Sequence, residues 1–288
     1  MTEKETNIIK KKILVKDYFL TQEEFYLIKN KEFGFLETHP QPLNSLANYY
    51  ESPNYFSHSN ENKSFFERLY HWIKTINIRY KFSIVSDKKG KKKLLDYGCG
   101  TGDFLAYAQK KNWTVLGSEP NEKARKIAQK KVGLTKVSTD SLSDISEKFD
   151  VITMWHVLEH IPNLDETLIE LKSKIYPDGR LIFALPNFES FDAKFYKHFW
   201  AAYDVPRHLW HFSPKSFEAL LKHHGMIIEK IYPLWFDSYY VSLLSEKYRK
   251  TKLGFFRALF IGTFSNFLAL FSKNYSSVVY KIKIKGIK

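Results

Sequence analysis

The stretch 94–102, which reads L-L-D-Y-G-C-G-T-G, constrains the fold more than any other part of this chain. Two apolar residues lead into an aspartate, and Gly98, Gly100 and Gly102 then alternate with other residues. A strand that ends in closely spaced glycines can turn tightly and bring its backbone close to a ligand. We expect a helix over 103–111 to follow and to point its free N–H groups at that ligand. The pattern therefore indicates a nucleotide-like cofactor at the carboxyl end of a strand.

Short apolar runs alternate with helical patterns from residue 93 onward, which is typical of βαβ units around a parallel sheet. Helices are predicted to begin at Asn121, Asn163 and Ser213, and the second of them ends at the turn signal 177–179. The predicted strands are 94–97, 114–119, 136–139, 149–155, 180–185, 226–232 and 277–285. The fold class is therefore α/β, with a doubly wound, mostly parallel seven-stranded sheet in a domain over 93–288.

Residues 1–92 do not follow this rhythm and are predicted to form an N-terminal extension. Residues 61–78 carry a helical stripe of apolar side chains, so we expect a helix there that packs on the main domain. The stripe consists of Phe65, Phe66, Leu69, Trp72, Ile73 and Ile76. The preceding segment, 18–55, is rich in aromatic residues, with turn signals at Gly34 and 39–42.

Charge and cysteine usage limit the classes of partner and compartment. The net charge of +14 invites an interpretation as a nucleic-acid-binding protein. However, the lysines are spread along the chain, with runs only at 10–12 and 88–93, so a solvated basic surface is favoured over nucleic-acid binding. The single cysteine, Cys99, excludes an internal disulfide and a multi-cysteine zinc site, and a cytoplasmic location is expected. The residues after Met1 contain no apolar signal core.

An apolar insertion over 238–272 interrupts the α/β pattern. Its segment 253–271 is nearly long enough to span a bilayer, but it contains Arg257 and Asn266, and a predicted strand follows it directly. We expect an apolar helix that covers the sheet or the substrate pocket. A peripheral contact with a membrane surface is the alternative interpretation.

Several polar residues follow the predicted strands at the edge where the glycine loop lies. Glu119 ends the second strand, at the distance from the glycine loop where an acidic residue accepts hydrogen bonds from ribose hydroxyls. Asp140, with the Ser141 amide beside it, ends the third strand and could meet an adenine edge. Trp155 and His156 end the fourth strand. Because the carboxyl ends of parallel strands meet at one edge, these residues together predict a single site.

With these residues in view, the chain resembles the class I S-adenosylmethionine-dependent methyltransferases, of the small-molecule type. The glycine stretch is similar to the first motif of that family, and two later segments are typical of one group within it. These segments are F-D-V-I-T-M-W-H-V-L-E-H at 149–160 and W-A-A-Y-D-V-P-R-H-L-W-H-F-S-P at 200–214. The loop reads G-x-G-x-G, whereas NAD sites carry G-x-G-x-x-G, which speaks against NAD.

The resemblance implies S-adenosylmethionine as the cofactor and assigns a role to each strand end. The glycine loop and Asp96 would surround the methionine part, Glu119 would take the ribose hydroxyls, and Asp140 would take the adenine. The predicted cofactor-binding residues are Asp96, Gly98, Cys99, Gly100, Gly102, Glu119, Asp140, Ser141 and Trp155.

Methyl transfer needs alignment of the acceptor and removal of its proton, for which histidine is well suited near neutral pH. We predict His156 as the general base, with a cofactor-orienting histidine as the alternative. Glu159 and His160 are expected to form a structural hydrogen-bonding pair.

The loop 200–212 is predicted to bind the acceptor, because connections at this edge usually cover the site. Its predicted substrate residues are Tyr203, Asp204, His208 and His211. The alternative is a packed structural loop in which Arg207 pairs with Asp204.

The N-terminal segment departs from the related chains. They often carry a cysteine pair, as if for zinc, before a segment like 29–42, but this chain has no cysteine there. We therefore predict no metal, and we expect Tyr18, Phe33 and Phe35 to hold this unit together.

Two features that the sequence lacks narrow the classes of methyl acceptor. The fourth strand lacks the N/D-P-P-F/Y tetrad of amino-group methylation, and Cys99 lies in the wrong place for a C5-cytosine nucleophile. This leaves oxygen or carbon methylation of a small sugar, ring-bearing or lipid-linked molecule. The alternatives are an RNA methyltransferase and a non-catalytic cofactor-binding module. The oligomeric state is open.

Overall fold

The computed structural model describes residues 12–50, 65–86 and 92–285, with the side chains of 65–71 left out. Seven of the described strands form one sheet, in the order β10-β11-β8-β7-β4-β5-β6. The strands are β4 (Lys93–Tyr97), β5 (Thr114–Ser118), β6 (Val137–Ser138), β7 (Phe149–Trp155), β8 (Ile175–Pro186), β10 (Met226–Pro233) and β11 (Ser277–Ile284). Within this sheet β11 is antiparallel to both its neighbours, and the other pairings are parallel. The predicted mostly parallel seven-stranded sheet is confirmed.

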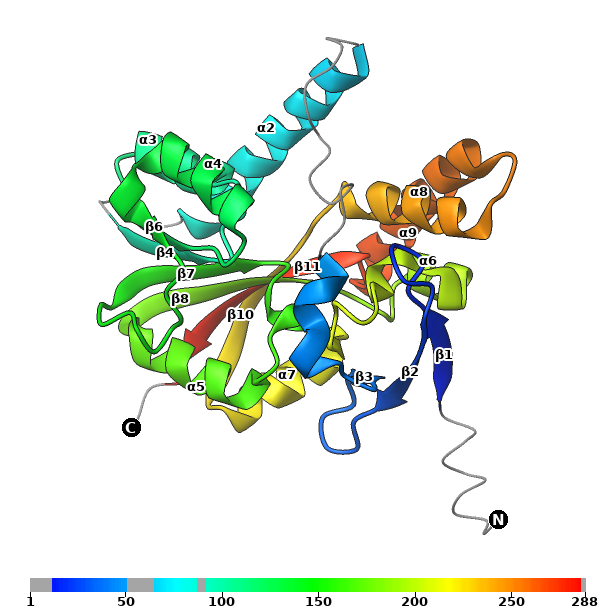
Figure 1. Ribbon diagram of the computed structural model, residues 1–288, viewed down its shortest axis with the longest axis horizontal. Coiled ribbons are helices and arrows are strands. Elements are labelled where there is room, and N and C mark those ends of the chain that lie inside the picture. Colours follow the sequence, from blue (N-terminus) through cyan, green and yellow to red (C-terminus); the bar gives the residue numbers. More distant parts are fainter. Residues whose placement is uncertain (1–11, 51–64, 87–91, 286–288) are drawn as a thin grey trace.

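Helices cover both faces of this sheet (Figure 1). One face carries α2 (Phe65–Val85), α3 (Asp103–Lys110) and α4 (Glu122–Val132), and the other carries α5 (Leu164–Lys174) and α7 (Pro214–His223). Each layer of helices has its own apolar core against the sheet, because the central strands are apolar on both faces.

Local capping follows the sequence at two of the three predicted helix starts. The Asn121 side chain accepts a hydrogen bond from the Ala124 amide, and Ser213 forms a capping box with Ser216. Asn163 precedes α5 but its side chain accepts no cap hydrogen bond. The predicted turn at 177–179 is a bulge inside β8, which therefore starts at Ile175.

A second, four-stranded sheet was not predicted. It contains β1 (Ile13–Lys16), β2 (Glu24–Lys29), β3 (Leu36–His39) and β9 (Trp210–His211), all antiparallel. Phe25 and Leu27 of β2 are buried while Tyr26 between them is 44% exposed, so the strand presents one face to the protein. A 3₁₀ helix, η1 (Leu43–Tyr50), follows β3.

The expectation that Tyr18, Phe33 and Phe35 hold the N-terminal unit together is met only in part: Phe33 stacks on Phe35 with ring centroids 6.1 Å apart, but other contacts lead out of the unit. Phe35 packs against Trp210 and Phe212 of the main domain, and Tyr18 stacks on Tyr248, at a ring-centroid distance of 5.1 Å. These rings therefore join the unit to the rest of the protein.

Only part of the predicted stripe on α2 can be judged. Phe65, Phe66 and Leu69 have side chains outside the described set. Trp72 is 62% exposed, and the buried contacts come from Ile84 and Val85 at the end of the helix. The expectation that Trp72 packs on the main domain is wrong.

The insertion forms a helical hairpin of α8 (Asp237–Arg249) and α9 (Gly254–Ser272), beside α6 (Phe191–Tyr196). Short 3₁₀ turns, η4 (Lys197–Phe199) and η5 (Ala201–Tyr203), connect α6 to β9. Many of the large apolar side chains of α9, among them Phe256, Phe260 and Phe271, are exposed. The helix packs mainly on α8 and α6 and not across the sheet, and the expected cover over the substrate pocket stays a prediction.

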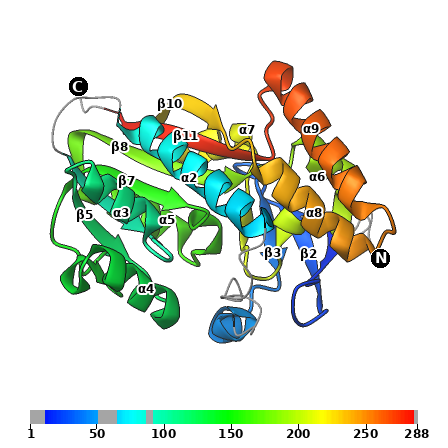
Figure 2. The same ribbon diagram turned by 90° about the horizontal axis from the view of Figure 1, so that it is seen from above.

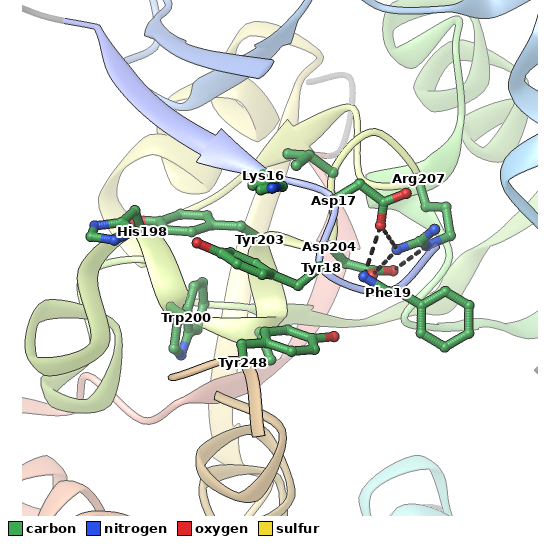
Figure 3. Close-up of a pocket in the computed structure, with 12 residues that line it drawn as sticks. Lys16, Asp17, Tyr18, Phe19, His198, Trp200, Tyr203, Asp204, Arg207 and Tyr248 are labelled. Atoms are coloured by element: carbon green, nitrogen blue, oxygen red, sulfur yellow. Dashed lines mark hydrogen bonds and ion pairs between the residues drawn. The ribbon is translucent and has the colours of Figure 1, made fainter. Parts of the chain in front are cut away.

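A buried arginine connects separate parts of the four-stranded sheet and its loops (Figure 3). Arg207 is 1% exposed and its Nη2 donates to Asp17 Oδ1 at 3.0 Å and to Asp204 Oδ1 at 2.6 Å. Its Nη1 donates to the Tyr49 carbonyl at 3.1 Å. The arginine therefore ties the end of β1 and the end of η1 to the loop before β9.

We predict that Arg207→Ala lowers the free energy of unfolding by about 3–5 kcal/mol, because it leaves buried carboxylates without their cation. Denaturant unfolding measures this. Lys222→Ala, which removes an exposed pair with Glu218, is the control and costs less than about 1 kcal/mol. Equal losses in the two variants would contradict the anchoring role.

Candidate functional site

The glycine loop has left-handed backbone angles at each glycine, with φ of 75° at Gly98, 54° at Gly100 and 72° at Gly102. A Cβ at Gly98 would lie 2.5 Å from Val157 Cγ2, and one at Gly102 would lie 2.7 Å from Ala128 Cβ. These two glycines allow close packing of the backbone. At Gly100 no described atom lies within 4 Å of the added Cβ, so this residue faces open space that a ligand can enter.

Glu119 closes the loop at the end of β5. Its Oε2 accepts a hydrogen bond from the Gly100 amide at 2.7 Å, and its Oε1 accepts one from the Asn121 amide at 2.9 Å. The residue as a whole is 8% exposed. Each carboxylate oxygen can accept more than one hydrogen bond, so this position suits ribose hydroxyls. The structure thus brings Glu119 and the glycine loop together as predicted.

Asp96 lies in β4, directly before the glycine loop. It is 1% exposed, its Oδ1 accepts a hydrogen bond from Thr153 Oγ1 at 2.6 Å, and burial raises the pKa of its carboxyl to about 7. Cys99 turns its side chain into the core, where Sγ lies under Gly117, and burial raises the pKa of its thiol well above the ordinary range. Cys99 can therefore contact a ligand mainly through its backbone.

Asp140 and Ser141, the two residues predicted near the adenine, differ in the hydrogen bonds that their polar groups make within the protein. The Asp140 side chain is exposed, beside Ser118, whose hydroxyl donates to the Asp140 carbonyl at 2.6 Å. The Ser141 amide and hydroxyl both donate to Asp144 Oδ2, at 3.0 and 2.6 Å. Ser141 is thus committed to its own turn, and the adenine role stays a prediction for Asp140.

Trp155 is the last residue of β7, and a lysine ammonium group lies over its ring. Lys81 of α2 places Nζ 4.5 Å from the centroid of the Trp155 ring, and burial lowers the pKa of the lysine. Trp155 Nε1 is buried and has no hydrogen-bond partner in the described part of the chain. An orphaned buried donor at this edge fits a missing ligand. Sequence reasoning missed Lys81, because it comes from the N-terminal extension.

His156 lies between two carboxylates. Its Nε2 is 3.0 Å from Asp237 Oδ2, and its Nδ1 is 3.3 Å from Glu159 Oε1. Burial opposes the charge on the ring, but the two carboxylates outweigh it and raise the pKa of His156 to about 9. At neutral pH the ring is therefore an imidazolium, a state that favours the orienting role. The base role stays a prediction.

Glu159 is fully buried and lies in a cluster with two further histidines. Its ligand oxygen and one nitrogen each of His160 and His208 lie within 4.8 Å of one another. Burial would raise the pKa of Glu159, but His156 holds it below its ordinary value. The expected hydrogen bond between Glu159 and His160 is not found; the His160 Nδ1 instead lies 2.9 Å from the Arg207 carbonyl. Glutamate and histidine side chains are ligands that divalent metals accept. The expectation that the protein binds no metal therefore stays a prediction.

Of the four predicted substrate residues, His208 and His211 are buried, while Tyr203 and Asp204 line the pocket drawn in Figure 3. Asp204 pairs with Arg207, which holds the pKa of that carboxyl below its ordinary value against the effect of burial. Burial and His160 lower the pKa of His208 to about 4. His211 bonds Thr38, and Tyr203 packs its ring against Trp200. The pair of Arg207 with Asp204 is the one expected for a packed structural loop, and the substrate role of the four residues stays a prediction.

We predict that His156 titrates near pH 9, well above the ordinary value of about 6.5. Because its folded-state pKa is raised, its contribution to stability is complete below about pH 6.5 and is lost as the pH rises toward 9. NMR titration of the His156 ring measures the value directly.

Asp237→Asn should move that titration downward, because it removes the carboxylate at Nε2. The control variant is Glu218→Gln, which changes an exposed carboxylate on α7 and should leave the His156 titration where it is. A His156 ring that titrates near 6.5 in the unaltered protein would contradict the bridge.

The chain is similar to known proteins in both sequence and fold. Residues 71–230, more than half of the chain, match a family model described as a methyltransferase domain. Two curated relatives are both named for ubiquinone biosynthesis O-methylation. The Actinobacillus pleuropneumoniae serotype 5b (strain L20) protein is 34% identical over 108 residues, which is 33% of this chain and 46% of that one. The mitochondrial protein of Schizosaccharomyces pombe (strain 972) is 27% identical over 157 residues, 49% of this chain and 57% of that one.

The chain thus matches about half the length of these relatives. Among solved structures, the O-methyltransferase of a trans-AT PKS multienzyme from Brevibacillus brevis, in complex with S-adenosyl-L-homocysteine, is similar with a TM-score of 0.51. The similarity covers 76% of this chain and 75% of that one at 18% identity, and it shows that the fold is shared.

Proposed function

The chain belongs to the methyltransferase domain family, and we propose that it transfers a methyl group from S-adenosylmethionine to an oxygen atom of a small acceptor. The family match confirms the resemblance found in the sequence, and with it the cofactor. The observation that carries the proposal is the pairing of Glu119 with the Gly100 amide, beside open space at the carboxyl edge of the sheet.

The described residues fit S-adenosylmethionine. Gly100 leaves room for close approach, Glu119 offers carboxylate oxygens for hydroxyls, and Trp155 Nε1 is a buried donor in need of a partner. When bound, the sulfonium supplies an already activated methyl group. The protein then has to hold the acceptor in line with it and exclude water.

Oxygen is favoured over carbon as the methylated atom because the curated relatives are named as O-methyltransferases. The same names support a ring-bearing acceptor of the kind handled in ubiquinone biosynthesis, and a phenolic hydroxyl is the simplest group of that class. A phenol must lose its proton on methylation, and positive charge near the site lowers the cost of the resulting anion. Lys81 and the imidazolium of His156 can supply that charge.

His156 acts differently in the two roles open to it. As a base it must first lose a proton, so activity would rise toward pH 9. As an orienting cation it would keep activity only while protonated, so activity would fall above pH 9. The carboxylate bridge favours the orienting role.

The proposal places the enzyme in the cytoplasm, on the basis of its single, buried cysteine. RNA methylation and a purely structural cofactor-binding module are the other candidates. Both are outcomes that the following experiment distinguishes.

The experiment supplies methyl-labelled S-adenosylmethionine with simple phenols and catechols, and separately with total RNA. We predict label on the phenolic oxygen, and a loss of about tenfold or more in kcat/KM for Glu119→Ala, because a lost charged hydrogen bond is worth more than about 1.4 kcal/mol. Glu122→Ala is the control, since this exposed neighbour forms a solvated pair with Lys126 and should leave the rate unchanged.

Label on RNA and none on the phenols would contradict the proposed acceptor class. Tight cofactor binding with no transfer to any acceptor would favour the binding module.

A further inference from the structure

Helix α9 has the reverse of the burial pattern that is usual for a surface helix in water: its large apolar side chains are mostly exposed. Its buried positions are mostly small or polar, and two of them make hydrogen bonds: Ser265 donates to Asp192 and Asn266 donates to the Trp235 carbonyl. The buried set is Ala258, Ile261, Gly262, Ser265, Asn266 and Ala269. A surface helix of a globular protein normally buries its large apolar residues instead.

The outward side of α9 is a continuous apolar face. Its exposed large side chains are Phe255, Phe256, Leu259, Phe260, Phe264, Phe267, Leu270 and Phe271, and they are between 37% and 76% exposed. The face lacks charged side chains, and its one exposed polar residue before Ser272 is Thr263. Figure 2 shows α9 at the outer edge of this end of the molecule, where it packs against α8 and α6. Contiguous apolar surface of this kind marks an interaction site.

Basic residues flank the apolar face at both ends. Lys250 and Lys252 precede it in the α8–α9 loop, and Lys273 follows it directly. Between residues 238 and 276 the chain has six basic residues and a single acidic one, Glu246. That glutamate is buried and pairs with Arg257 at 2.7 Å, so it does not offset the flanking charge.

We propose that the α9 face docks on the surface of a bilayer that carries anionic lipids. The phenylalanine rings would enter the boundary between headgroups and acyl chains, and the flanking lysines would contact lipid phosphates. A helix of 19 residues is about 28 Å long and can lie flat with this whole face in contact. The proposal does not depend on which acceptor the enzyme methylates.

Docking on the surface fits the connections better than crossing the membrane does. Within the described residues, α9 alone is long and apolar enough to span a bilayer. However, the hairpin begins after β10 and ends at β11, which are neighbours in one sheet, so a crossing by α9 needs a second crossing to return. At 13 residues, or about 20 Å, α8 is too short for that.

A second copy of the chain fits this face less well than a lipid surface does. In a two-fold pairing of α9 with itself, the lysines at the helix ends would meet lysines of the other copy, in either direction of the helices. Anionic headgroups meet the same lysines with opposite charge.

The test is flotation of the full chain with vesicles, either of phosphatidylcholine alone or of phosphatidylcholine mixed with phosphatidylglycerol. We expect binding to the mixed vesicles that salt weakens. The double variant Phe260→Glu/Phe267→Glu should lower the bound fraction about tenfold or more, because it removes inserted apolar surface. Lys250→Glu/Lys252→Glu should weaken binding to the mixed vesicles only.

The control variant Leu134→Glu/Ile169→Glu changes two side chains that are similarly exposed, 74% and 60%, but lie elsewhere. It should bind vesicles as the unaltered protein does. Circular dichroism and S-adenosylhomocysteine affinity show that each variant is folded.

Three results would overturn the proposal. The first is a chain that stays unbound with the mixed vesicles, and the second is a phenylalanine variant that binds as well as the unaltered protein. The third is a dimer in sedimentation analysis that the same phenylalanine variant dissociates, which would assign the face to a second copy.

Discussion

The bridge from Asp237 through His156 to Glu159 joins the parts of the molecule on which the site depends. It holds the end of β7 against the first residue of α8 and against the buried turn that follows the strand. A buried carboxylate or imidazolium alone is costly, whereas this alternation of charges compensates each member. The bridge therefore connects the cofactor edge of the sheet to the hairpin whose far side is the α9 face.

The parallel sheet supplies the other constraint. Because its strands end at one edge, residues from separate positions in the chain meet there without any long-range motif. Gly100 and Glu119 come from two neighbouring strands and meet through a hydrogen bond of 2.7 Å. This geometry is why a short glycine pattern and one acidic residue could predict a cofactor site.

The parts predicted from the sequence are those written in local patterns. The apolar runs placed the seven strands, and the caps at Asn121 and Ser213 marked two helices. The small sheet was missed, although the alternation around Tyr26 is a strand signal, because its last strand comes from residues 210–211. His208 and His211 were predicted to bind the acceptor, but both contact Thr38 of β3: its hydroxyl donates to the His208 carbonyl and lies 2.9 Å from His211 Nε2.

Long-range partners carry no local signal. Lys81 reaches Trp155 from the N-terminal extension, so the sequence could not place it in the site. His208 was predicted as a site residue, but its contact with Glu159, nearly 50 residues away in the chain, was not. The outward orientation of the apolar side chains of α9 could not be predicted for another reason. The composition of the helix predicts burial, but only the structure shows that the small and polar residues such as Ser265 face inward.

The central claim is that the edge around Gly100 and Glu119 binds S-adenosylmethionine. Calorimetric titration with S-adenosylhomocysteine, and with NAD as the competing nucleotide, tests it most directly. The account predicts a micromolar dissociation constant for the adenosyl ligand, its loss in Glu119→Ala, and no heat with NAD. Absence of adenosyl binding, or NAD binding of equal strength, would contradict it.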